Sequence, residues 1–277
     1  MKVFYSKRML ADSESFSPSA SKPAEVVNSW KTLGILMDIV EPAPVTVDQL
    51  ALAHDRAFVE GVLSGARKNG FGNRSPAIAA SLPYTTGAML AAAREALLNG
   101  RVAVAPCSGF HHAGYDEAGG FCTFNGLMVT ACALRLEGLA ETVGILDFDE
   151  HWGDGTEEIL KYLNADWITH YSAGATWHSR EQATHFLAAI PRIVATMANC
   201  DVILYQAGAD PHLDDPLGGW LTTAQLRKRD RAVFESARKL DVPIAWNLAG
   251  GYQTPLSKVL RIHDNTMLEC VSIYGNL

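Results

Sequence analysis

The chain has 277 residues, 48% of them hydrophobic and 19% charged, with a net charge of −7 at pH 7. This composition supports one large domain, which we expect to span residues 1–277. A mildly acidic chain without a basic run argues against a nucleic-acid partner. Five cysteines without a CxxC pair indicate buried thiols in a reducing compartment, so we expect a cytoplasmic protein. No long apolar run predicts a signal peptide or a membrane span, and nothing here sets an oligomeric state.

Helices and strands are predicted to alternate along most of the chain. Strand patterns cover 1–5, 102–105, 143–149, 167–169, 201–206, 242–248 and 271–274. Helical patterns cover 24–37, 45–65, 87–98, 125–136, 157–163, 181–197, 223–240 and 256–261. This alternation predicts an α/β fold, with a central, mostly parallel sheet and helices on both of its faces.

One predicted strand runs directly into three ionisable residues. Asp147, Asp149 and His151 follow the apolar run 143–146 at intervals of two, a spacing that places side chains on one face of a strand. Carboxylates and an imidazole crowded together are costly to bury unless a cation compensates them, and such ligands suit zinc or iron(II). The alternative is a strand that ends in a polar turn, because Asp and Gly are common in turns.

Three further polar stretches also follow predicted strands. They are His111-His112 with the later Gly119–Cys122, Gly208-Ala209-Asp210, and Gly250-Gly251-Tyr252. The ends of parallel strands emerge on one side of a sheet, where α/β proteins build their sites. Paired histidines can act as acid and base, a tyrosine hydroxyl can donate to an oxyanion, and glycines let a substrate approach the backbone. Singly, each stretch could be a surface turn or a helix cap; their shared placement favours a site.

Taken together, these motifs resemble the zinc-dependent histone deacetylase family, which includes bacterial acetylpolyamine amidohydrolases. The motifs are HHA with a following GGFC, then DFDEHWGDGT, GAD with DDPLG, and GGY, and they occur in the family's order between residues 111 and 252. The resemblance implies a three-layer arginase/deacetylase-like fold. It also implies zinc-dependent hydrolysis of an acylated primary amine such as acetyl-lysine, with release of acetate.

The resemblance also implies roles for individual residues. The metal ligands would be Asp149, His151 and Asp210. The catalytic residues would be His112 as general base and acid, His111, Tyr252 as the oxyanion donor, and Asp147 and Asp154 as partners of His111 and His112. The walls and rim of the substrate tunnel would include Gly120, Phe121, Leu217, Gly250 and Gly251. The metal would be Zn2+, with Fe2+ as the alternative in the cell, and the family pattern allows a K+ ion near 168–170, where no serine is evident.

Two other functions compete with this interpretation. The first is hydrolysis of acetylated polyamines or another small amide by the same residues. The second is a catalytically silent binding module, against which the complete set of six motif residues argues: His111, His112, Asp149, His151, Asp210 and Tyr252. An arginase-type site with two manganese ions would need a further set of Asp and His ligands, which we cannot assign in this sequence.

Overall fold

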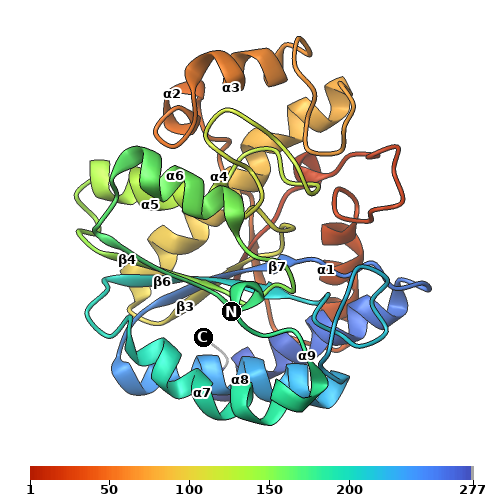
Figure 1. The fold of residues 1–277 in the computed structure, drawn as a ribbon, viewed down its shortest axis with the longest axis vertical. Helices are drawn as coiled ribbons and strands as arrows, with labels where there is room; N and C mark the ends of the chain where they lie inside the picture. The colour runs from red at the N-terminus through yellow and green to blue at the C-terminus, as the bar shows by residue number, and fades with distance from the viewer. Residues whose placement is uncertain (276–277) are drawn as a thin grey trace.

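The structure is a computed structural model that describes residues 1–275. These residues contain one sheet of seven strands, all parallel, which confirms the predicted fold class (Figure 1). In spatial order the strands are β2 (Asp38–Val40), β1 (Lys2–Phe4), β3 (Val102–Ala105), β7 (Ile244–Ala249), β6 (Val202–Gly208), β4 (Val143–Asp147) and β5 (Ile168–Ser172). Because β6 lies between β4 and β7, the polar stretches that follow these three strands emerge side by side.

Helices cover both faces of the sheet. Figure 1 shows α4, α5 and α6 on one face and α7, α8 and α9 on the other. The α-helices are α1 (Lys22–Thr32), α2 (Val47–Leu50), α3 (Arg56–Leu63), α4 (Pro76–Asn99), α5 (Gly126–Leu136), α6 (Asp154–Leu163), α7 (Ala183–Ala195), α8 (Thr223–Leu240) and α9 (Ser257–Tyr274). Three 3-10 helices cover Lys7–Met9, Ala173–Ala175 and Arg180–Gln182.

The central strands are apolar on both faces because each face packs against a helical layer. In β4, Leu146 belongs to the cluster on the α7–α9 side, whereas Ile145 belongs to the cluster on the α4–α6 side. Both side chains are fully buried. A strand buried on both sides reads as a continuous apolar run, and this is why the sequence pattern located β3, β4, β6 and β7.

Several predicted elements differ from the observed ones. Residues 271–274 were expected to be a strand but form the end of α9, where Ile273 and Tyr274 continue its buried stripe. The region 45–65 is two helices rather than one, because Asp55 caps α3 by accepting from the N–H of Phe58 at 2.8 Å. Strand β2, short and mostly exposed at the sheet edge, has no apolar pattern to predict it. Helix α4 begins 11 residues before the expected 87, upstream of an internal proline, Pro83.

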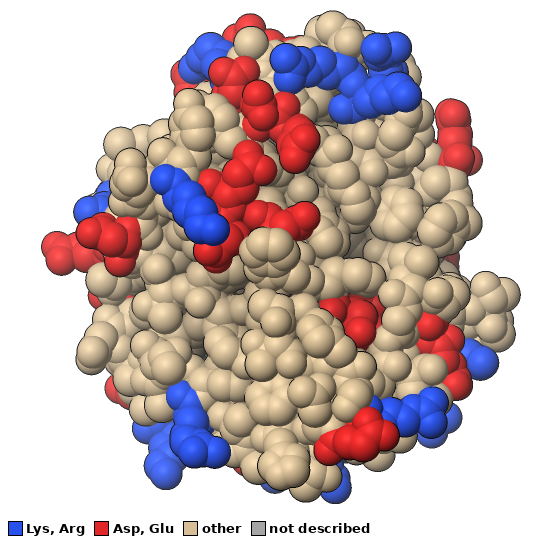
Figure 2. All heavy atoms as spheres, viewed as in Figure 1, with Lys and Arg blue, Asp and Glu red and all other residues tan. Residues whose placement is uncertain are grey.

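Charge is spread unevenly over the surface. In the view of Figure 2, acidic side chains form a band across the upper part of the face, while Lys and Arg gather mainly towards its top and bottom edges. Within residues 1–275, no helix is both long enough and apolar enough to cross a bilayer.

Candidate active site

The turn after β4 carries the central residues of the site. The sequence had indicated that Asp147, Asp149 and His151 share one face of a strand, and this prediction was wrong. Strand β4 ends at Asp147, so Asp149 and His151 lie beyond it. The turn is instead held by its own carboxylates. Asp147 Oδ1 accepts from the N–H of Asp149 at 3.1 Å, and Asp149 Oδ1 accepts from the N–H of His151 at 3.0 Å. Asp side chains favour such local hydrogen bonds. The hydrogen bonds within the turn therefore orient the side chains of Asp149 and His151.

Asp149, His151 and Asp210 form a compact cluster. Their candidate ligand atoms all lie within 4.8 Å of one another, and Asp210 comes from the end of the neighbouring strand β6. Both carboxylates are buried. Among the described residues, Asp210 Oδ2 has no hydrogen-bond partner, although it lies 3.3 Å from Nδ1 of His151. A buried oxygen without a donor, beside a second carboxylate and an imidazole, fits the ligand set of a divalent cation.

The ring of His151 is oriented so that it can act as a ligand of the same cation. Its Nε2 lies 3.2 Å from the carbonyl oxygen of Leu217 and can donate to it. In the neutral ring, Nδ1 then carries the lone pair and faces Asp149 at 3.2 Å and Asp210 at 3.3 Å. The hydrogen bond to Asp149 and the nearby negative charge of Asp210 raise the pKa of His151 to about 11. The position therefore strongly stabilises positive charge, which a metal ion can supply as well as a proton can.

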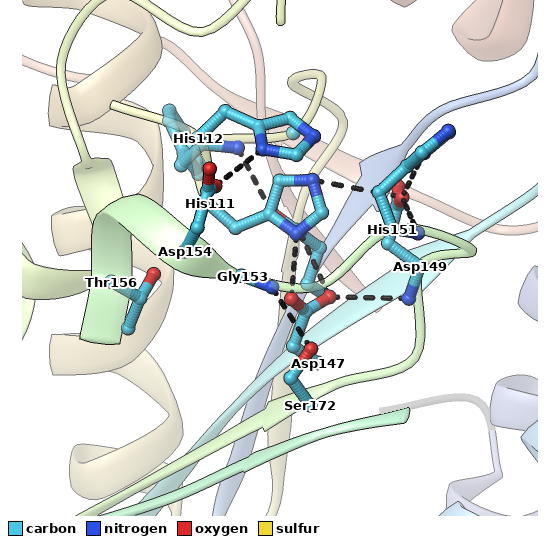
Figure 3. A network of polar contacts seen from close by, with 12 residues as sticks. His111, His112, Asp147, Asp149, His151, Gly153, Asp154, Thr156 and Ser172 are labelled. Carbon is cyan, nitrogen blue, oxygen red and sulfur yellow. Dashed lines mark hydrogen bonds and ion pairs between the residues drawn. The ribbon is translucent and has the colours of Figure 1, made fainter. Parts of the chain in front are cut away.

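The two adjacent histidines each pair with a carboxylate (Figure 3). His111 Nδ1 lies 2.7 Å from Asp147 Oδ2, and His112 Nδ1 lies 2.6 Å from Asp154 Oδ1. Burial and the neighbouring His111 lower the pKa of His112, and Asp154 only partly opposes this shift. Burial also lowers the pKa of His111, but Asp147 and Asp149 outweigh it and bring the pKa to about 9. The pair therefore combines a neutral imidazole at His112 with a charged one at His111.

Tyr252 is held beside the cluster by its backbone. Its N–H donates to Asp215 Oδ2 at 2.8 Å, and its ring centroid lies 5.5 Å from that of Phe121. Burial, together with the charges of Asp210 and Asp149, raises the pKa of the Tyr252 phenol. The hydroxyl therefore stays protonated and able to donate a hydrogen bond.

Glycines permit the close packing of this site. Gly250 has a φ of +43°, and a Cβ there would lie 2.1 Å from Cγ of Asp210. Gly120 has a φ of +53°, and a Cβ there would lie 2.4 Å from the ring of His112. Both positions thus require glycine for backbone conformation and for space.

Three of the five expected tunnel residues line the catalytic pocket, and the other two lie at its margin. A pocket of about 20 Å3 is lined by Gly120, Phe121 and Gly250, together with His111, His112, Asp149, His151 and Tyr252. Leu217 contributes its carbonyl to His151, and its side chain is 38% exposed. Gly251 lies behind the pocket, where a Cβ would meet Val259 at 2.6 Å. The structure thus brings the expected residues together, with Leu217 and Gly251 at its margin.

Three buried residues that support the site were not identified from the sequence. Arg229 donates through Nη1 to the carbonyl of Phe148 at 3.0 Å and to that of Gly208 at 2.7 Å. Phe148 directly precedes Asp149, and Gly208 lies two residues before Asp210. Gln206 donates to Asp147 Oδ1 at 2.9 Å and accepts from the N–H of Phe110 at 2.9 Å. Lys22, fully buried at the start of α1, donates to the carbonyl of Gly250.

A serine also lies beneath the turn. Strand β5 extends to Ser172, which aligns with Asp147 across the ladder, and Ser172 Oγ accepts from the N–H of Gly153 at 3.0 Å (Figure 3). The comparable position was expected at 168–170, where the sequence has no serine. The difference arises because β5 ends at Ser172, beyond the expected strand 167–169.

Comparisons with known proteins agree on one family. The histone deacetylase domain model matches residues 18–173 and 164–267, and the chain therefore belongs to the histone deacetylase domain family. An uncharacterised protein of Picosynechococcus sp. is 24% identical over 83% of this chain and 87% of its own length. Histone deacetylase 8 of Danio rerio is 27% identical over 58% of this chain, and histone deacetylase 2 of Arabidopsis thaliana is 26% identical over 55%. The matched parts span 46% and 44% of those two proteins.

A solved structure shows the same fold. The HD domain of HDA15 superposes with a TM-score of 0.79 at 20% identity, covering 99% of this chain and 90% of that one. Family membership supports a deacetylase or related amidohydrolase activity. The family is generally metal-dependent, and the buried cluster of Asp149, His151 and Asp210 could bind a metal.

Proposed function

We propose that this chain is a single catalytic domain that uses zinc to hydrolyse the amide of an acylated primary amine, such as acetyl-lysine. One observation carries the proposal: a carboxylate–imidazole–carboxylate cluster, a carboxylate-paired neutral histidine and a protonated tyrosine meet in one pocket. Each would serve a separate need of amide hydrolysis: a Lewis acid, a proton carrier and an oxyanion donor.

Asp149, His151 and Asp210 would hold the metal. Three protein ligands leave coordination positions free, as catalytic zinc sites require. When bound there, a divalent cation would polarise the amide carbonyl and lower the pKa of the attacking water. Borderline ligands of this kind admit iron(II) as well as zinc. Ser172 and the backbone around Asp147 are the candidate surroundings for a potassium ion, which would support this turn from below.

His112 would move the proton. Its Nδ1 is occupied by Asp154, so a neutral ring presents Nε2 to the pocket as a base. Water would lose a proton to this nitrogen as its oxygen bonds to the carbonyl carbon. The same proton would then pass to the leaving nitrogen as the carbon–nitrogen bond breaks, giving a free amine and a carboxylic acid, which ionises to the carboxylate. The charged His111, paired with Asp147, would stabilise the negative charge that develops nearby.

Tyr252 would donate its hydroxyl hydrogen to the oxyanion that forms from the carbonyl oxygen. Its raised pKa keeps that hydrogen in place, and its backbone bond to Asp215 fixes its position before the substrate arrives. Gly120 and Phe121 would form one wall of the channel that receives the alkyl stem of the amine, with Leu217 at its rim.

Acetylated polyamines are the second candidate substrates. The chain carries a net charge of −7, and acidic side chains form a band on the face shown in Figure 2, so cationic substrates would be attracted. Peptides and polyamines would use the same catalytic residues and would differ only in their contacts outside the pocket.

The test is the metal content of the purified protein together with its turnover of a fluorogenic acetyl-lysine amide and of acetylated polyamines. We expect about one divalent ion per chain and turnover that His112→Ala abolishes without removing the ion. Protein that binds no ion and turns over none of these amides would instead be a silent binding module.

A further inference from the structure

An exposed aromatic ring lies on the outer side of the catalytic pocket. Phe16 is 70% exposed, yet its ring centroid lies 5.4 Å from that of Phe121 and 6.2 Å from that of Tyr252. Phe121 and Tyr252 both line the catalytic pocket, and their own ring centroids are 5.5 Å apart. Phe16 therefore extends the aromatic wall of this pocket towards solvent.

A further ring joins this wall from another segment of the chain. The ring centroid of Phe71 lies 5.8 Å from that of Phe121, and the N–H of Phe121 donates to the carbonyl of Gly70 at 3.0 Å. Phe121 has a φ of +64°, a left-handed conformation that is uncommon for a residue with a large side chain and that tends to occur at functional sites. We call Phe16, Phe71 and Phe121 the entrance rings.

Hydrogen bonds hold the loop that carries Phe16. Ser13 Oγ donates to the carbonyl of Ser17 at 3.1 Å, which closes the loop across Phe16. Asn73, two residues after Phe71, donates through Nδ2 to the carbonyl of Ser13 at 2.9 Å. The loops of Phe16 and Phe71 are thus joined, so the ring of Phe16 is presented to solvent by a supported segment.

The size of the catalytic pocket leaves much of a bound amine outside it. The pocket has a volume of about 20 Å3. A water-sized group needs roughly 10–15 Å3 of such space, so an acylated amine extends well beyond the opening. The part of the amine past the acylated nitrogen therefore lies along the entrance rings. Exposed apolar surface that continues from a pocket is typical of a place where a ligand docks.

The charges near the entrance rings favour an aromatic group over an ammonium group. Asp215 is buried, and it already accepts from the N–H of Tyr252 at 2.8 Å and from that of Leu217 at 3.1 Å. Asp12 and Glu14 belong to the loop that carries the outermost ring, but both are exposed, so water and salt screen their attraction for a cation. Leu217 adds an apolar side chain, 38% exposed, at the rim of the same pocket.

We propose that Phe16 is a specificity-determining residue, which binds an aromatic group on the amine part of the substrate. The inference rests on the proposed amide hydrolysis and names the class of amine. This class is a primary amine whose stem ends in an aromatic group, such as an acylated lysine beside an aromatic residue in a peptide. Aromatic rings in edge-to-face or offset contact attract one another beyond the burial of their area. Acylated polyamines, whose stems are cationic, would be the poorer substrates.

The first experiment compares kcat and KM for acetyl-lysine benzylamide, acetyl-lysine methylamide and an acetylated spermidine. The benzylamide should exceed the methylamide by about tenfold in kcat/KM, the effect of burying roughly half of a phenyl ring, and the difference should lie in KM. Phe16→Ala should reduce this ratio to about twofold or less, and Phe16→Trp should keep it. Leu98→Ala is the control, because Leu98 is 81% exposed on the last turn of α4, just before β3 begins at the opposite edge of the sheet.

The second experiment uses salt to separate an aromatic occupant from a cationic one. The preference for the benzylamide should change by less than about twofold between roughly 0.05 M and 0.5 M NaCl, because apolar contacts are not screened. Binding of an ammonium group at the entrance rings would instead weaken steadily over this range.

The third experiment measures affinity by calorimetry on metal-loaded His112→Ala protein, which should bind the amides without hydrolysing them. The benzylamide should bind about tenfold more tightly than the methylamide. Adding Phe16→Ala to this variant should remove the difference, and adding Leu98→Ala should not.

The outcomes separate this inference from the proposed hydrolysis. If the benzylamide binds more tightly through Phe16 but no amide is hydrolysed, the inference stands and the hydrolytic function falls. Equal affinity for the benzylamide and the methylamide overturns the inference, as does a preference that survives Phe16→Ala or a lack of binding by either amide. A preference for acetylated spermidine that weakens with salt overturns it too and assigns the entrance rings to a cation.

Discussion

Nη1 of Arg229 donates to the carbonyl oxygen of Phe148 at 3.0 Å, which ties helix α8 to the residue just before Asp149. The same nitrogen donates to Gly208 at the end of β6. One buried guanidinium thus fastens the ends of the two strands that deliver the candidate metal ligands. Its charge is balanced by Asp230, which accepts from Nε at 2.8 Å.

Replacing Arg229 should destabilise the fold. Arg229→Ala leaves the Asp230 carboxylate buried with only the hydroxyls of Tyr205 and Thr266 as donors, so we expect a loss of about 3–5 kcal/mol in the free energy of unfolding. Urea denaturation of the metal-free protein measures this loss. Lys228→Ala on the same helix removes an exposed lysine side chain and should cost no more than about 1 kcal/mol. Equal losses in the two variants would show that Arg229 does not hold the ends of the two strands together.

The position of Arg229 explains what the sequence could and could not predict. Helix α8 is rich in charge, and Arg229 looks like its neighbours Arg227 and Arg231 in a list of residues. Its helical phase is the missed signal, because Arg229 and Asp230 lie in the buried stripe that runs from Leu226 to Val233. Lys22 was missed for a different reason: it lies near the end of the stretch 11–23, whose Ser, Ala and Pro content is typical of a loop, whereas α1 begins at Lys22.

The central strands and the grouping of the motif residues could be predicted from the sequence. Continuous apolar runs identified the central strands, and parallel strands bring their following loops to one edge of the sheet. The turn geometry after β4 could not be predicted from the sequence. The same spacing of Asp147 and Asp149 fits either one face of a strand or a turn in which each carboxylate accepts from a nearby backbone N–H. The entrance rings were also beyond the sequence, since they depend on packing between segments far apart in the chain.

Asp210→Ala should remove the metal. The substitution deletes one of three candidate ligands, and we expect metal affinity to fall by more than about 100-fold, a loss larger than that from removing a residue which only supports a ligand. Elemental analysis after dialysis against a weak chelator measures the occupancy, and activity should fall with it. Asp214→Asn, exposed on the same loop, is the matched control. Full occupancy in Asp210→Ala would rule Asp210 out as a ligand.

Tyr252→Phe should slow the reaction without loss of metal. Only the hydroxyl is removed, so the rate should fall by about 100-fold to 1,000-fold, the range seen for one oxyanion donor. Single-turnover rates on protein of known metal content separate this effect from metal loss. Tyr162→Phe, an exposed tyrosine on α6, controls for the loss of a phenol elsewhere. A variant that keeps the full rate would show that Tyr252 does not polarise the carbonyl.

His54 should make stability depend on pH. Its Nδ1 donates to the carbonyl of Gly114 at 2.8 Å, and its Nε2 accepts from the N–H of Asn125 at 2.8 Å, so only the neutral ring satisfies both contacts. Burial lowers its pKa from 6.5 to about 4 despite the backbone hydrogen bonds. The stabilisation from neutral His54 is therefore fully present above pH 6.5 and is lost as the pH falls through 4, up to about 3 kcal/mol in all. Unfolding free energies of the unaltered protein and of His54→Gln, measured from pH 7.5 to 4.5, should converge as the pH falls. A constant difference between them would mean that His54 titrates alike in the folded and unfolded chains.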